Sequence, residues 1–147
     1  MDGSEFRRLR DLPGKCIIGD IRLAQRSDIS AAWEAKDILI TNADGVDARL
    51  TIQLVSETGA KTLNVKVAGV GPICRLEVDS RPHAPAGRSH KHALHTPDCP
   101  RDNLKRDVTD RSDLNGRPLK AVFDAFCQMA QITHEGALIV PPDLDGI

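Results

Sequence analysis

Aromatic side chains are scarce in this chain of 147 residues, which has three Phe, one Trp and no Tyr. The scarcity argues against a platform of exposed rings on which nucleic-acid bases stack. Any core must instead be aliphatic, and 40% of the residues are hydrophobic. This content and length suit one packed domain over residues 1–147.

Other absences exclude whole classes of protein. The four cysteines form no C-x-x-C pair, no apolar run reaches the roughly 18 residues of a membrane span, and we identify no signal peptide. The motifs of nucleotide-binding loops, serine hydrolases and zinc peptidases are missing. The net charge of −1 gives no global attraction to nucleic acids or membranes. We therefore expect a cytoplasmic protein with reduced thiols, no membrane contact and no cofactor.

Alternating hydrophobic residues predict an antiparallel β-meander, because short turns join consecutive strands. Exposed sheet edges are compatible with a homodimer, and the sequence leaves the oligomeric state open. The fold class we expect is α+β, an antiparallel sheet of five to six strands with a C-terminal helix packed on one face. The expected strands are residues 16–24, 33–41, 49–54, 62–67 and 73–79.

The predicted helix runs from Pro118 to about Thr133, because its apolar residues recur at helical spacing. Asn115 or Gly116 is expected to cap its start, and Gly136 to end it. Beyond it, residues 137–140 are either a final short strand or a tail.

Two segments lie outside this pattern. Residues 1–14 are a charged lead-in with a short helix near Arg7–Asp11, and we give Gly3-Ser4-Glu5-Phe6 no function because adjacent cloning sites often encode it. Residues 81–116 contain four prolines and no periodicity, which predicts a long functional loop or insertion. The aspartates at 107, 110 and 113 are interpreted as a solvated surface.

Four of the five histidines, His83, His90, His92 and His95, lie close together in the sequence. Histidine titrates near neutral pH and serves as acid or base, while Arg or Lys can clamp a phosphate. One interpretation is therefore metal-independent cleavage of RNA, in which a base activates the 2′-hydroxyl and an acid protonates the leaving oxygen. The candidate catalytic residues are His83, His90, His92 and Arg75; the candidate substrate-binding residues are Arg81, Arg88, Lys91 and His95; the candidate orienting carboxylates are Glu77 and Asp79.

Other interpretations of the same segment stay open. His90 and His92, with His83, His95 or Cys99, would supply enough ligands for zinc, although the spacing matches no standard zinc module. The basic loop would also suit a non-catalytic interaction module, such as a phage- or mobile-element-encoded inhibitor that binds a host protein or its nucleic acid. Histidines in a polar loop are also often only solvated.

A resemblance bears on this choice. Asp79-Ser80-Arg81-Pro82-His83, followed by His90-Lys91-His92, resembles the D-x-x-P-H … H-x-H pattern of TumE-like toxins of bacterial toxin–antitoxin modules. The resemblance covers roughly residues 33–132, and its specific part is Arg75 to His92. It implies a ribonuclease-type growth inhibitor whose partners are RNA and a helix-turn-helix antitoxin.

Overall fold

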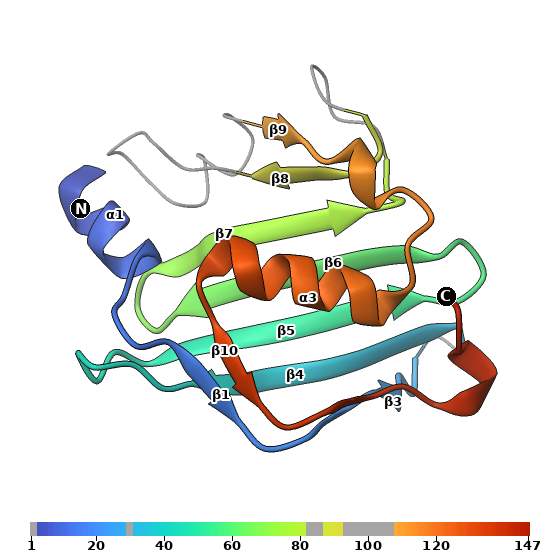
Figure 1. Cartoon of the computed structure of the whole chain (residues 1–147), viewed down its shortest axis with the longest axis horizontal. Helices are drawn as coiled ribbons and strands as arrows, with labels where there is room; N and C mark the ends of the chain where they lie inside the picture. Colours follow the sequence, from blue (N-terminus) through green and yellow to red (C-terminus); the bar gives the residue numbers. More distant parts are fainter. Residues whose placement is uncertain (1–2, 29–30, 82–86, 93–107) are drawn as a thin grey trace.

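A seven-stranded antiparallel sheet is the centre of the computed structural model (Figure 1), which describes residues 3–28, 31–81, 87–92 and 108–147. The predicted α+β class, with an antiparallel sheet and a C-terminal helix, is confirmed. In spatial order, the strands are β3 (Ala24–Gln25), β4 (Ala32–Ile40), β5 (Ala48–Val55), β6 (Ala60–Val67), β7 (Gly71–Val78), β8 (His90–His92) and β9 (Val108–Asp110).

The meander from β4 to β7 follows the predicted alternation. On β5, Leu50, Ile52 and Leu54 are buried, whereas the residues between them are only half-buried. The sheet nevertheless extends beyond the five to six strands expected, because β8 and β9 lie inside the segment 81–116 that the sequence predicts to be a loop. These two short strands place two of the histidines in the sheet rather than beside it.

Helix α3 (Leu119–Ala130) packs on one face of this sheet, over β6 and β7 (Figure 1). Its apolar stripe is buried as predicted, but its boundaries differ. Pro118 takes the N-cap position without a side-chain hydrogen bond, and the helix ends before Gln131 rather than at Gly136. Gln131 has a left-handed φ of 57°, which stops the helix where β10 (Thr133–Glu135) must begin.

The lead-in belongs to the fold. Helix α1 (Gly3–Arg10) packs against β7, and Phe6 and Leu9 are buried in the same core as α3. Two 3₁₀ turns complete the described elements, η1 (Ser112–Leu114) and η2 (Pro142–Leu144). No helix in the described ranges is both long enough and apolar enough to cross a membrane.

The single strand expected over residues 16–24 is wrong. It is divided into β1 (Cys16–Ile18), β2 (Ile21–Arg22) and β3, with Gly19 at a φ of 100° between the first two. β1 pairs in parallel with β10, and β2 pairs in parallel with β11 (Leu138–Ile139). Residues 137–140 therefore contain a strand, and it lies beside a segment from the start of the chain.

Candidate functional site

The histidine pair of the sequence motif lies on β8, which forms an antiparallel ladder with β7. In this ladder Glu77 lies opposite His90, and Arg75 lies opposite His92. Residues directly opposite one another in a ladder share a face of the sheet. The ladder therefore brings the R-x-E sequence of β7 and the H-x-H sequence of β8 to one place.

Arg75, Glu77 and His90 are bonded to one another, and we call them the Arg–Glu–His cluster. An Nη of Arg75 donates to Oε1 of Glu77, while Oε2 of Glu77 lies 2.9 Å from Nε2 of His90. Nδ1 of His90 lies 3.0 Å from the carbonyl oxygen of Gly87. Glu77 thus connects a guanidinium to an imidazole, and both ring nitrogens of His90 face oxygen acceptors.

The three side chains of the cluster differ in how much of each is exposed to solvent. The side chain of His90 is 1% exposed and that of Glu77 is 14% exposed, whereas Arg75 keeps 33% of its side chain accessible. A buried ring whose two nitrogens both lie within 3.0 Å of oxygen atoms is suited to hold its neighbours in place rather than to meet a substrate. Arg75 is the member of the cluster that a ligand can reach.

Asp110 supports the cluster from β9, where it lies opposite His90. One carboxylate oxygen accepts a hydrogen bond of 3.2 Å from the N–H of Gly87, the residue whose carbonyl faces His90. The other accepts from the N–H of Ser112. Hydrogen bonds from the Ser112 side chain and from these two N–H groups lower the pKa of Asp110. Sequence reasoning treated Asp110 as solvated surface, although Asp-x-Ser is a signal for this kind of turn.

Asp79, the other candidate orienting carboxylate, has different partners. Its oxygens accept from the N–H of Gly116 at 3.0 and 3.1 Å and lie 3.7 Å from Nζ of Lys61 and 3.3 Å from Nε of Arg88. The residue has a φ of 55°, which turns the chain out of β7. Of the two candidate carboxylates, the structure therefore brings Glu77 to a histidine and uses Asp79 to fix the chain that precedes α3.

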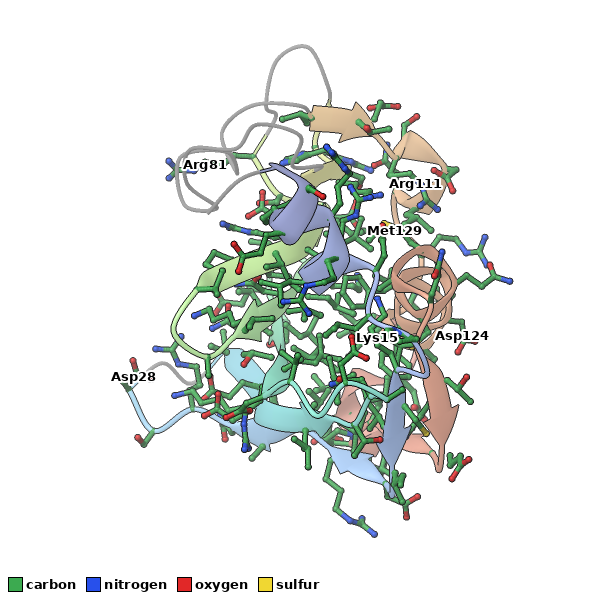
Figure 2. The ribbon with its side chains drawn as sticks, turned by 90° about the vertical axis from the view of Figure 1, so that its left-hand side faces the viewer. Lys15, Asp28, Arg81, Arg111, Asp124 and Met129 are labelled. Carbon is green, nitrogen blue, oxygen red and sulfur yellow. The ribbon has the colours of Figure 1, made fainter. Side chains whose placement is uncertain are left out.

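The remaining candidates are dispersed. Lys91 lines a cavity on the α3 side of the sheet, away from the cluster. Arg81 is exposed and lies on the opposite side of the sheet from α3 (Figure 2). Arg88 is half exposed and pairs with Asp79. His83 and His95 lie outside the described residues, so their predicted roles stay predictions.

A polar stripe crosses the sheet on the face that carries the cluster. In the second of two neighbouring cross-strand rows of this stripe, Oδ1 of Asn64 and Nε of Arg75 are buried on paired residues, and neither atom has a hydrogen-bond partner among the described residues. Sequence reasoning missed Asn64, which only the register identifies. The first row is Glu34, Gln53, Thr62, Glu77, His90 and Asp110, and the second is Thr51, Asn64, Arg75, His92 and Val108.

A metal site is not formed by the described part of the chain, which has no group of three or more His, Cys, Asp or Glu that could hold an ion. The zinc interpretation relied on His83, His95 or Cys99, and all three lie outside the described residues. It therefore stays a prediction.

No family model, curated protein or solved structure matches the chain. The chemistry of the polar face is therefore the basis on which a function is assigned.

Proposed function

We propose that this protein is a metal-independent, ribonuclease-like toxin of a toxin–antitoxin module that cleaves RNA in the cytoplasm. The observation that supports this most is the Arg–Glu–His cluster, with His92 opposite Arg75 in the ladder. The cluster combines a reachable cation with buried groups that fix its position. This is the arrangement that phosphate chemistry without a metal requires.

The proposed reaction is transesterification within the RNA. A base removes the proton of a 2′-hydroxyl, and the 2′-oxygen attacks the adjacent phosphorus. The bond from phosphorus to the 5′-oxygen then breaks, and an acid donates a proton to that oxygen. The products are a 2′,3′-cyclic phosphate and a 5′-hydroxyl, so atoms and charge balance without any further reactant.

Each residue has a role in this proposal. His92 and His83 are the acid–base pair, in an order that the proposal leaves open, and Arg75 neutralises the charge that develops on the phosphorane. Glu77 orients Arg75, and His90 in turn orients Glu77, so both are positioning residues. A helix-turn-helix antitoxin is the proposed protein partner, because the Asp79–His92 motif resembles that of the TumE-like toxins.

The test is cleavage of a generic RNA by the purified protein with EDTA present. We expect cleavage to a 2′,3′-cyclic phosphate, and a loss of at least about a hundredfold in rate for His92→Ala, because a positioned acid or base contributes that much. Lys66→Ala is the matched control, since Lys66 is an exposed cation on β6. It is expected to retain the wild-type rate.

Two results would contradict the proposal. Equal cleavage by the wild type and His92→Ala would mean that the histidine pair does not act in the reaction. RNA binding without cleavage, in preparations free of other nucleases, would favour a non-catalytic interaction module instead. The segment that carries Arg81, Arg88 and Lys91 would then be its contact surface.

A further inference from the structure

On the α3 side of the sheet, a cavity of about 380 Å³ lies between the end of α1, strands β7 and β8, and the end of α3. Figure 2 shows Met129, which lines it, and Lys15 on this same side of the sheet. Its volume is within the range of pockets that hold small molecules. Among its lining residues are Arg10, Asp11, Cys74, Lys91, Met129 and Gln131.

Positive charge gathers at this cavity. Arg10 and Lys91 line it, and Lys15 is held beside it because its Nζ donates to the carbonyl oxygen of Arg10 at 2.7 Å. Among the described residues, the only carboxylate in the lining is that of Asp11, and Arg10 already binds it at 3.0 and 2.8 Å. Within the described part of the chain, three cations and one carboxylate therefore leave two positive charges uncompensated.

The two lysines are the unusual members. Lys15 is only 7% exposed, and within the described residues neither Lys15 nor Lys91 has a carboxylate partner at ion-pair distance. Burying an ammonium group without a counter-charge is costly, and the cost disappears when an anion binds. Burial lowers the pKa of Lys15, which reflects the same cost.

The thiol of Cys74 completes the floor without competing for these charges. It is 6% exposed, and burial raises its pKa although Lys91, Lys15 and Arg10 act in the opposite direction. The side chain is therefore a neutral thiol at neutral pH. The positive charges stay available to a ligand.

We propose that this cavity binds the phosphate group of a small phosphate monoester or of inorganic phosphate. Two uncompensated positive charges match a phosphate dianion better than they match a carboxylate, which carries a single charge. The guanidinium of Arg10 and the ammonium of Lys91 are the groups that contact the phosphate. Lys15, which is bonded to the backbone of Arg10, contributes a further positive charge beside the cavity. A ligand here would also hold β8, because Lys91 lies between His90 and His92 on that strand.

The site is independent of the proposed RNA cleavage, since the cavity and the Arg–Glu–His cluster lie on opposite sides of β7 and β8. Its experiment therefore measures binding rather than activity. The full chain is titrated with inorganic phosphate, and separately with adenosine monophosphate, in an isothermal titration calorimeter. A titration with sodium chloride at equal ionic strength is the blank.

We expect saturable binding to the wild type and a loss of roughly tenfold or more in affinity for Lys91→Met, because one neighbouring charge is removed. Lys66→Met is the matched control, with the same charge change at an exposed position on β6. It is expected to bind as the wild type does. Asp11→Asn is expected to bind severalfold more tightly, since it removes the competing carboxylate.

Tighter binding of adenosine monophosphate than of inorganic phosphate would identify a nucleotide-sized ligand, and equal binding would identify the phosphate group alone; both support the site. Absence of binding at millimolar concentrations of both probes would overturn the proposal. Equal losses in Lys91→Met and Lys66→Met would overturn it as well, because the effect would then be one of overall charge.

Discussion

At the scale of single residues, Asp79 shows how one side chain can connect three parts of the fold. It ends β7 with a positive φ, binds the N–H of Gly116 ahead of α3, and faces Nζ of Lys61, a lysine that is only 2% exposed. Burial lowers the pKa of Lys61, and the charge of Asp79 opposes that shift. The carboxylate is therefore the counter-charge of a buried cation.

Replacing Asp79 with Asn tests this role, because Asn tolerates positive φ and keeps one oxygen that can accept from the N–H of Gly116, while the negative charge is lost. We expect the free energy of unfolding to fall by about 3 kcal/mol, since Lys61 would hold a buried charge without its partner. Urea unfolding measures the change. Asp44→Asn, at a carboxylate that is 41% exposed, is the control and should change the value by less than about 0.5 kcal/mol. Equal effects in the two variants would contradict the role of Asp79.

Sequence reasoning named three side chains that the structure brings together, but it did not identify all of their partners. Arg75, Glu77 and His90 were named as site residues, and the structure brings them together. The choice between Glu77 and Asp79 depends on the register of β7 with β8 and on the positive φ of Asp79. Neither is visible in a hydrophobic pattern, so the sequence leaves both carboxylates as equal candidates.

At the scale of elements, the end of α3 is a point where local preference and tertiary pairing disagree. The apolar spacing continues to Ile132, but the helix ends at Ala130 because Thr133 pairs with Cys16 on β1. Gln131 then takes the left-handed conformation that glycine usually supplies.

Gln131→Gly is therefore expected to raise the free energy of unfolding by about 1 kcal/mol, because glycine adopts this φ without steric cost. Gln128→Gly is the matched control, at an exposed position inside the helix, and is expected to lower it by about 1 kcal/mol. Thermal unfolding of both variants gives the comparison. A loss of stability in Gln131→Gly would show that the amide side chain matters more than the backbone conformation.

Strands β8 and β9 show why the sheet edge escaped prediction. β8 is His90-Lys91-His92, which has no hydrophobic alternation, and its place is fixed by ladder bonds and by the contact of His90 with Glu77. The meander, by contrast, is recognisable because alternate residues such as Leu50 and Ile52 are buried in the hydrophobic core. Strands that bury alternate apolar residues can therefore be predicted from the sequence. Strands that are positioned by polar contacts, such as β8, cannot.

At the scale of the whole molecule, folding favours the neutral thiols of Cys74, which is buried, and Cys127, which is partly buried. Burial, with a smaller contribution from Asp124, raises the pKa of Cys127 from 9.0 to about 12. In the unfolded chain this thiol ionises near pH 9, so between about pH 9 and 12 the unfolded state binds fewer protons than the folded state. The free energy of unfolding must fall as pH rises through this window.

Cys127→Ala is expected to make the protein less sensitive to alkali. Its melting temperature should decline less between pH 9 and 10.5 than that of the wild type, while Cys74, whose pKa is also raised, retains part of the effect. Melting curves at pH 7.5, where neither thiol ionises in either state, give the reference for each protein. Parallel declines in the two proteins would show that Cys127 does not contribute.

The parallel pairing of β1 with β10 and of β2 with β11 has a consequence for how the protein folds. The hydrogen bond from Ala137 N–H to Asp20 joins residues 117 positions apart, whereas the hairpins of the meander form between near neighbours. Closing so long a loop costs entropy before any contact compensates for it. The meander can thus assemble early as a local nucleus. The pairing of β1 and β2 with β10 and β11 can then form last, and it joins the two ends of the chain beside the completed sheet.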